Sequence, residues 1–358
     1  MLRVKRMDDI TENVAIDAWV KAFSRSRAQA NAPHEADAEL IELPGAPGQL
    51  LAITIDTVAE EIQAGLYSDP YTMGWVTAMA SLSDLAAVGA EPLGVVVSAS
   101  VPAGCDPALV EGIGRGIEDA CRSLGVHVLG GDSNATPAIS LTGCAVGLVP
   151  EDEVITRRGL AVGDALFLTG PCGTGNALGL ARLGGLPNEF YPEARYRPSA
   201  RLAAGRNLRG RATACMDTSD GVLATLDQLM RLNGHGFEIP CDWSRLIDAS
   251  VLAFCDETGT PAWMMLAGPH GEFELAFTVA AGDAEDLSLV AGDWPTRPIR
   301  IGTVQERPAI TLVLGSGRRA DIDMAPLRNL LDTAGGDFTR YLREFKELGS
   351  AWKLDEQS

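Results

Sequence analysis

Lysine is almost absent from this chain of 358 residues. It occurs only at Lys5, Lys21, Lys346 and Lys353, all near the two ends. A central active site therefore has no lysine for a P-loop, for the ATP site of a protein kinase or for a Schiff base. If the chain handles phosphate groups, divalent metal ions and arginine side chains must neutralise their charge.

Paired cysteines, excess positive charge and long apolar runs are also missing. The seven cysteines are isolated and form no CxxC pair, so neither a zinc ribbon nor a disulfide framework is indicated. The formal net charge of −19 argues against a nucleic-acid or anionic-membrane partner. No apolar run approaches the ~20 residues that cross a bilayer, and acidic residues follow soon after the first Met. We expect a cytoplasmic protein that acts on small molecules.

The length favours two domains, and strands alternate with helices along the whole chain. In the first half we expect strands over 50–56, 94–101, 126–132 and 138–149, and helices over 72–88 and 107–124. In the second half we expect strands over 164–170, 273–280 and 309–315, helices over 177–183 and 222–232, and further helix in the long stretch before Arg209. This order predicts an α/β (α+β) fold with domains at 1–156 and 157–345 and a polar tail at 346–358.

Aspartates at the ends of apolar runs are the informative signal. Such a run ends on Asp56, on Asp132 and on Asp217, and Asp84 lies in the helical stretch that follows Asp56. A carboxylate at a strand end points into the crevice where α/β folds bind ligands. Several carboxylates there would repel one another unless cations intervened, and hard oxygen ligands of this kind select Mg²⁺ or Mn²⁺. Taken alone, each aspartate could equally cap a turn or a helix.

The amino-acid sequences of five segments make the interpretation of these aspartates more specific. DTVAEEIQ, GWVTAMASLSDLAAVGAEP, LGGDSN, ITRRGLAVGDALFLTG and MDTSDGVLATLDQL occur in this order. Together they closely resemble the signature series of thiamine-monophosphate kinases, within the AIR-synthase superfamily, and the resemblance runs from about residue 35 to residue 340.

That resemblance implies a two-domain AIR-synthase-like fold. Its N-terminal domain would bind ATP and metal, and its sheet would form a barrel with the sheet of a second subunit in a homodimer. The C-terminal domain would be α/β. The implied activity is phosphoryl transfer from ATP, a co-substrate, to thiamine monophosphate, with Mg²⁺ (or Mn²⁺) as the cofactor.

The resemblance also assigns roles to single residues. Magnesium ligands are expected at Asp37, Thr54, Asp56, Asp84, Asp132, Asp217 and Asp220. ATP contacts are expected at Gly131, Asp132, Arg157 and Ser219, and the catalytic carboxylates are Asp84, Asp132 and Asp217. These assignments agree with the absence of lysine from the middle of the chain, because an arginine and metal ions would together neutralise the charge of the phosphates.

Departures from the family pattern gather at the acceptor end. Ala36 stands where the family has the first of two aspartates, and Gln63 replaces a histidine that faces the substrate. In PHGEFEL the first acid of the family motif has become Gly271. The expected acceptor contacts are Gln63, His270, Glu272 and Phe338, the last being an aromatic residue that would close over the substrate. We therefore expect an altered acceptor site and an acceptor less cationic than thiamine monophosphate.

Two other functions stay open on the sequence alone. The chain could be a kinase, or a ligase like AIR synthase, that acts on a different small molecule. It could also be a nucleotide-binding regulator that has lost catalysis, given Ala36 and Gln63. ATP turnover that depends on an added acceptor distinguishes an enzyme from a regulator.

Overall fold

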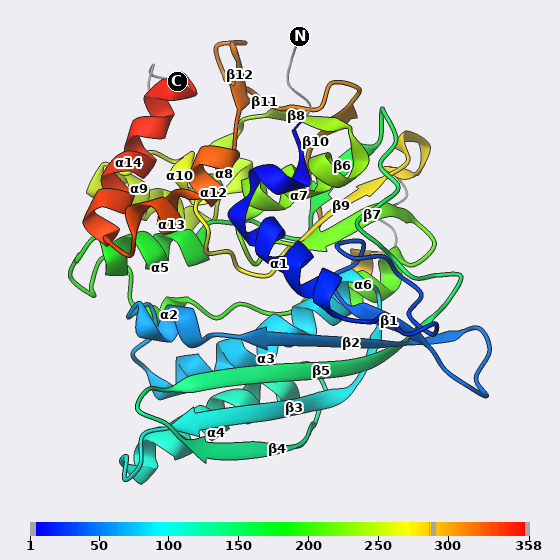
Figure 1. Ribbon diagram of the computed structural model, residues 1–358. Coiled ribbons are helices and arrows are strands. Elements are labelled where there is room, and N and C mark those ends of the chain that lie inside the picture. Colours follow the sequence, from blue (N-terminus) through cyan, green and yellow to red (C-terminus); the bar gives the residue numbers. More distant parts are fainter. Residues whose placement is uncertain (1–4, 286, 288–290, 355–358) are drawn as a thin grey trace.

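A computed structural model describes residues 5–285, 287 and 291–354, which form two units stacked on each other (Figure 1). Each unit contains one mixed β-sheet with helices packed on it. The predicted α/β class is confirmed. No helix of the described residues is long and apolar enough to cross a membrane.

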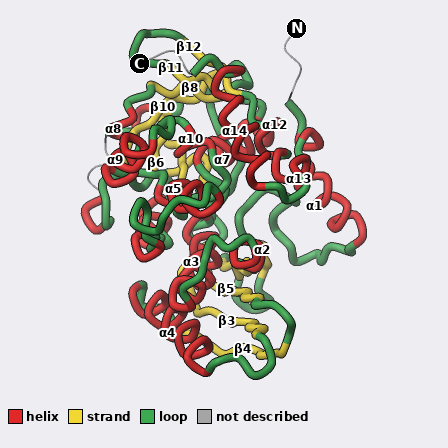
Figure 2. Tube along the Cα trace, turned by 90° about the vertical axis from the view of Figure 1, so that its left-hand side faces the viewer, coloured by secondary structure: helices red, strands yellow, loops and turns green. Residues whose placement is uncertain are grey.

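The first unit is a five-stranded sheet with the order β1-β2-β5-β3-β4. Its strands are β1 (Glu39–Glu42), β2 (Gln49–Thr57), β3 (Glu91–Val101), β4 (Val128–Ala135) and β5 (Ser140–Pro150). Neighbours are antiparallel except β3 and β4, which are parallel and joined by the helix α4 (Pro107–Ser123). The helices α3 (Pro70–Ala87) and α4 cover one face, and no helix covers the other face in this view (Figure 2).

Alternation along each strand decides which side chains face α3. On β2, Thr54 is buried while its neighbour Ile55 is 70% exposed. Thr54 donates a hydrogen bond to Asp84 of α3, so this side of β2 faces the helix. Asp56 follows two residues later and shares that side, because strand side chains alternate with a period of two.

The second unit is a seven-stranded sheet with the order β12-β11-β8-β10-β6-β9-β7. Its strands are β6 (Ala165–Leu168), β7 (Ala212–Asp217), β8 (Gly236–Pro240), β9 (Leu275–Val279), β10 (Ile299–Gln305), β11 (Ile310–Val313) and β12 (Arg319–Ile322). The helices of this unit are α5 (Thr174–Leu183), α6 (Leu202–Leu208), α7 (Val222–Asn233), α8 (Trp243–Leu246), α9 (Ala249–Thr258), α10 (Met264–Ala267), α12 (Ala325–Arg328), α13 (Leu330–Ala334) and α14 (Phe338–Ala351).

Helix α3 joins the two units. It packs on the first sheet and also meets α6 of the second unit, where Gly205 lies directly against the last turn of α3. Beside this contact Arg206 makes two hydrogen bonds to the carboxylate of Glu91, at 2.9 and 2.8 Å. The Nε atom of Arg209 donates to the carbonyl oxygen of Gly89 at 2.6 Å. The units are therefore held in one orientation by close backbone approach and by arginine side chains.

The first helix of the chain packs on the second unit. In α1 (Thr11–Ala22), Asn13 donates to Gln228 of α7 at 3.3 Å, and the backbone N–H of Thr11 donates to Asn329 at 2.8 Å. The chain then crosses to β1 of the first unit (Figure 1). The predicted domain boundary at 156 stays a prediction. Residues before β1 contact residues that come after this boundary in the sequence.

One expectation about the second half was inaccurate. Helix before Arg209 is limited to α6, because Pro192 and Pro198 interrupt the preceding stretch. The expected polar tail at 346–358 is in part the end of α14, whose neighbour Trp352 packs edge-on against Trp263 at 5.4 Å between ring centroids. Residues 355–358 of that tail lie outside the described residues.

The close contact between α3 and α6 can be tested by a substitution that adds one methyl group, Gly205→Ala. A Cβ atom at position 205 would lie 2.0 Å from the carbonyl oxygen of Ala86. We expect Gly205→Ala to lower the free energy of unfolding by about 1–3 kcal/mol, measured by urea denaturation. In Gly114→Ala, on the exposed side of α4, the new methyl group meets open space. That variant should be about 0.5–1 kcal/mol more stable than the parent. Equal effects of both variants would contradict close contact at the junction.

Candidate active site

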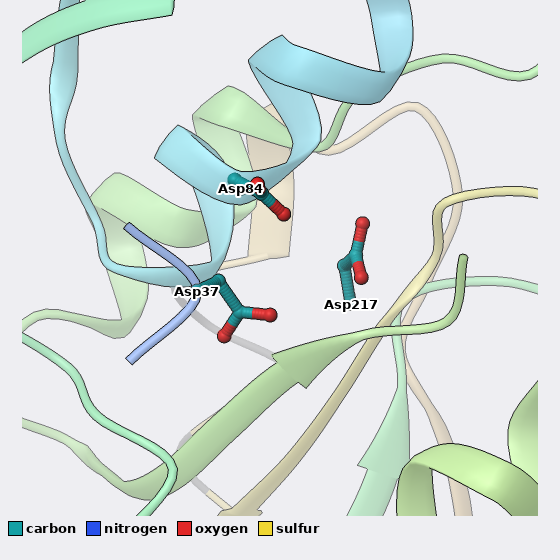
Figure 3. Close-up of side chains that lie close together, drawn as sticks. All are labelled: Asp37, Asp84 and Asp217. Carbon is teal, nitrogen blue, oxygen red and sulfur yellow. The ribbon is translucent and has the colours of Figure 1, made fainter. Parts of the chain in front are cut away.

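Three aspartates from separate parts of the chain meet between the two units (Figure 3). Asp37 lies just before β1, Asp84 in the last turn of α3, and Asp217 at the end of β7. One carboxylate oxygen of each lies within 4.8 Å of those of the other two. The predicted convergence of Asp37, Asp84 and Asp217 is therefore what the structure shows.

Local hydrogen bonds fix two of these carboxylates. Thr54 on β2 donates its hydroxyl to Oδ2 of Asp84. After β7 the chain turns sharply, and Ser219 donates both its hydroxyl, at 3.0 Å, and its backbone N–H, at 3.4 Å, to Oδ1 of Asp217. Both pairs hold one oxygen of the carboxylate, and in Asp217 the other oxygen, Oδ2, is buried without a hydrogen-bond partner.

Asp56 belongs to the same acidic group, although it lies outside the tight trio. Its Oδ2 atom is buried without a hydrogen-bond partner, as are the Oδ2 atoms of Asp37 and Asp217. Within the described part of the chain, these three residues and Asp84 make one ion pair, between Asp37 and Arg157 at 2.9 Å. Four carboxylates with one arginine leave the group short of positive charge.

The pKa values reflect this shortage. Burial, followed by the charges of Asp56, Asp217 and Asp37, raises the pKa of Asp84 well above its ordinary value. Burial and the charge of Asp37 raise the pKa of Asp217 to about 7. Burial is also the main reason why the pKa of Asp56 is raised. Burial first, and then repulsion from the neighbouring carboxylates, opposes the ionised form of all three residues.

Asp220 lies on the far side of the turn from Asp217. Burial and the charge of Glu12 raise the pKa of Asp220 to about 6, while Arg328 and Arg157 act to lower it. The charges of Arg157 and Asp56 thus also affect the pKa of Asp220, but Asp220 is not one of the three carboxylates that meet.

Asp132 lies elsewhere. It is paired in register with Ser98 of the neighbouring strand β3. Ser98 is paired with Thr142 of β5, and Thr142 is paired with Thr57 of β2. Residues in register share a side of a sheet, so Asp132 is on the open side, opposite Thr54 and Asp56. Three strand spacings of ~4.8 Å also separate β4 from β2. Every residue of β4 is exposed, Gly131 and Asp132 included.

Comparison with known proteins identifies the family. The chain matches the family model of the AIR synthase related protein, N-terminal domain, over residues 35–149. The thiamine-monophosphate kinase of Halobacterium salinarum is 32% identical over 231 residues, which are 64% of this chain and 76% of that protein. The thiamine-monophosphate kinase of Archaeoglobus fulgidus is 30% identical over 237 residues, which are 66% of this chain and 75% of that protein. This chain belongs to the thiamine-monophosphate kinase family.

Solved structures agree with this assignment. The thiamine-monophosphate kinase of Stenotrophomonas maltophilia superposes with a TM-score of 0.66 at 25% identity, covering 84% of this chain and 95% of that chain. A crystal structure from Thermus thermophilus superposes with a TM-score of 0.72 at 26% identity. As a member of the thiamine-monophosphate kinase family, the chain is an ATP-dependent kinase.

The segment PHGEFEL, residues 269–275, packs against the turn that carries Asp217. Gly271 donates its N–H to the carbonyl oxygen of Ser219 at 2.8 Å. A Cβ atom at position 271 would lie 1.5 Å from the carbonyl oxygen of Thr218. Any side chain there, acidic or not, requires the turn to move. The glycine is therefore explained by close packing, and it does not show that a charge was removed from the acceptor site.

Two other residues of this motif make contacts inside the second unit. The carboxylate of Glu272 accepts the N–H of Gly173 at 2.7 Å, at the start of α5. Burial raises the pKa of Glu272 to about 7. The glycine-rich loop GPCGTG, residues 170–175, leads into α5. It binds the carboxylate of Glu272 at the position where a phosphate-binding loop would bind a phosphate. The Nε2 atom of His270 lies 3.0 Å from the Tyr67 hydroxyl, and burial lowers the pKa of this histidine to about 4.

The remaining expected acceptor residues lie at the ends of helices. Gln63 is exposed at the last residue of α2 (Ala59–Gln63), and Phe338 is half-buried at the first residue of α14. Glu61, also on α2, is a residue that the motif comparison did not select. Its Oε2 atom is buried without a partner. Only its place in the fold, beside Asp56 and Asp220, distinguishes it from the exposed Glu60.

The raised pKa of Asp217 predicts a pH dependence for the metal-free protein. The folded-state value of about 7 lies above the ordinary value of 3.8. This residue therefore favours folding fully below pH ~4 and loses that contribution as the pH rises through ~7. In EDTA we expect the free energy of unfolding to fall between pH 5.5 and pH 8. Asp217→Asn keeps the acceptor oxygen for Ser219 and should show a flatter profile. Identical slopes for the two proteins would contradict the assignment.

Proposed function

We propose that this kinase transfers the γ-phosphoryl group of ATP to thiamine monophosphate, forming thiamine diphosphate and ADP. The observation that carries the proposal is the meeting of Asp37, Asp84 and Asp217, in a chain whose relatives are thiamine-monophosphate kinases. In the proposed step a terminal phosphate oxygen of the acceptor bonds to the γ-phosphorus. The bond from that phosphorus to the β,γ-bridging oxygen breaks, and ADP leaves with the electron pair.

The acidic group fits magnesium. It offers hard oxygen ligands, and three of its buried oxygens have no hydrogen-bond partner. Asp37, Asp84 and Asp217 would hold the metal, with Thr54, Asp56 and Asp220 as the neighbouring oxygen donors. The chemistry that magnesium supplies when bound is neutralisation of charge on the polyphosphate.

The protein's own groups would position the reactants. Arg157 is the arginine next to the acidic group, and its side chain is 17% exposed, so it would contact a phosphate while still paired with Asp37. Ser219 lies at the same turn, and its hydroxyl would contact the nucleotide by exchanging its hydrogen bond to Asp217 for one to a phosphate oxygen. Their placement supports these assignments, since both residues border the trio.

A different acceptor is the second candidate. Gln63 and Ala36 stand where the family signature has a histidine and an aspartate. A kinase or AIR-synthase-like ligase for another small molecule would keep the metal-binding carboxylates and change these positions. A panel of acceptors with labelled ATP, starting from thiamine monophosphate, separates the two candidates. A protein that binds ATP and transfers phosphate to none of the panel would be a nucleotide-binding regulator.

The catalytic role of the trio gives a direct activity test. Asp84→Asn should lower turnover at least ~1,000-fold, because charge compensation provides most of phosphoryl-transfer catalysis. Removal of divalent metal with EDTA should abolish turnover. Asp152→Asn, in an exposed turn, removes one charge that is not part of the trio and should leave turnover unchanged. Full activity of Asp84→Asn, or activity in EDTA, would exclude the metal-cluster mechanism.

We further propose a homodimer formed by the open face of the first sheet. Ile55, Cys144 and Val96 are in register across three strands of this face, and Ile55 is 70% exposed. An apolar row beside the fully exposed strand β4 is a surface that soluble proteins cover. A second copy on this face would form the barrel expected from the family. Asp132 is on the same face, so any role for it in catalysis requires this second copy.

Light scattering tests the dimer. The parent chain should have twice the 37.7 kDa mass of one subunit at micromolar concentration. Ile55→Lys places a charge in the row and should shift the protein toward the monomer. Val110→Lys is the matched control, because Val110 is 51% exposed on α4, which covers the opposite face. A monomeric parent protein would contradict the proposal.

A further inference from the structure

Asn233, the last residue of α7, has a side chain that the proposed mechanism does not use. Its Nδ2 atom donates hydrogen bonds to the carbonyl oxygen of Arg157 at 2.8 Å and to that of Leu229, one turn back in α7, at 2.8 Å. Its Oδ1 atom accepts the backbone N–H of Gly159 at 3.0 Å. Both donors of the amide therefore meet carbonyl oxygens and its acceptor meets an N–H group. Two of these three bonds hold the backbone of the loop 156–159.

The same loop is also bonded to two segments of the acidic site. The backbone N–H of Arg157 donates to the carbonyl oxygen of Glu35 at 2.7 Å, in the segment that carries Asp37. The carbonyl oxygen of Thr156 accepts the N–H of Cys215, on the strand β7, at 3.0 Å. The main chain of Arg157 is thus held through its N–H by the segment of Asp37 and through its carbonyl oxygen by α7.

The guanidinium group of Arg157 has donors to spare. One of its nitrogens donates to Asp37 at 2.9 Å, while its Nε atom is buried without a hydrogen-bond partner among the described residues. An arginine binds a phosphate well when its planar group is held in the right orientation. The side chain has several rotatable bonds, so a fixed backbone limits how far the guanidinium group can move.

We propose that Asn233 is a positioning residue for Arg157, because it holds the backbone of the loop 156–159 and so fixes the guanidinium group where ATP phosphates would bind. This inference rests on the proposed function, since it takes Arg157 to contact a phosphate of ATP. The helix α7 begins just after the turn that follows Asp217, and its residues 222–231 are all buried. One buried helix therefore connects the turn after Asp217 with the loop of Arg157.

Capping of α7 is the competing role for Asn233, because the last carbonyl groups of a helix need partners. Other groups already supply such partners. Gly234, in the left-handed region, donates its N–H to the carbonyl oxygen of Met230, and Arg158 donates from its side chain to that of Leu232 at 2.9 Å. Arg158→Met removes a contact between the same loop and the same helix end, and it leaves the backbone bond from Asn233 in place. It is the matched control.

Calorimetry of the full chain with Mg²⁺ and a non-hydrolysable ATP analogue tests the inference through a double-mutant cycle. Arg157→Met should weaken binding of the analogue about 10- to 100-fold, since a charge-assisted contact is lost. Asn233→Ala should weaken it at least about 3-fold, and less than about 2-fold further when Arg157→Met is already present. Asn233→Asp keeps the acceptor for Gly159 but loses both donors, so it should bind no better than Asn233→Ala. Arg158→Met should bind as the parent does.

The cycle separates positioning from a purely structural role. A structural role predicts that Asn233→Ala weakens binding by the same factor with and without Arg157→Met, and that result would overturn the inference. Parent-like binding by Asn233→Ala, or an equal loss in Arg158→Met, would also overturn it. If Asn233→Ala does not fold, Asn233→Asp carries the same cycle.

The proposed function is judged by a separate readout, the formation of thiamine diphosphate by the parent protein. If none forms and the effect of Asn233→Ala still depends on Arg157, the inference stands and the proposed function fails. If thiamine diphosphate forms and that dependence is absent, the proposed function stands and the inference fails. A parent protein that does not bind the ATP analogue would contradict both.

Discussion

Electrostatic repulsion among buried carboxylates is the constraint on which this structure depends. Asp37, Asp84 and Asp217 are held together from three parts of the chain, with Asp56 beside them and Arg157 as the paired arginine. Such an arrangement opposes folding unless the rest of the protein holds it in place. The close contact of α3 with α6 and the crossing of the N-terminal segment between the units provide that support.

The same repulsion explains why the site suits phosphoryl transfer. In the proposed mechanism these carboxylates would bind metal ions together with a polyphosphate, and that binding would relieve the repulsion. Stability and activity are thereby linked, because a ligand that binds only the folded state adds its binding free energy to folding. Substitutions that relieve the charge should stabilise the empty protein and weaken its function, the usual trade-off at active sites.

Sequence reasoning could predict the fold and the acidic residues that meet between the two units. Strand periodicity and an aspartate after each apolar run located Asp84 and Asp217, and the family signature added Asp37. The side of the sheet on which Asp132 lies could not be predicted, because it depends on strand order and register across β3, β4 and β5. The glycine at 271 and the unpaired Glu61 were also missed as structural features, since both depend on contacts between elements far apart in sequence.

Anomalous diffraction from crystals grown with Mn²⁺ and a non-hydrolysable ATP analogue tests the central claim most directly. The account predicts at least one manganese peak at ~2.0–2.2 Å from carboxylate oxygens of Asp37, Asp84 and Asp217, with Arg157 on a phosphate oxygen. Manganese bound elsewhere, with these three carboxylates free of metal or paired only with arginine, would contradict it.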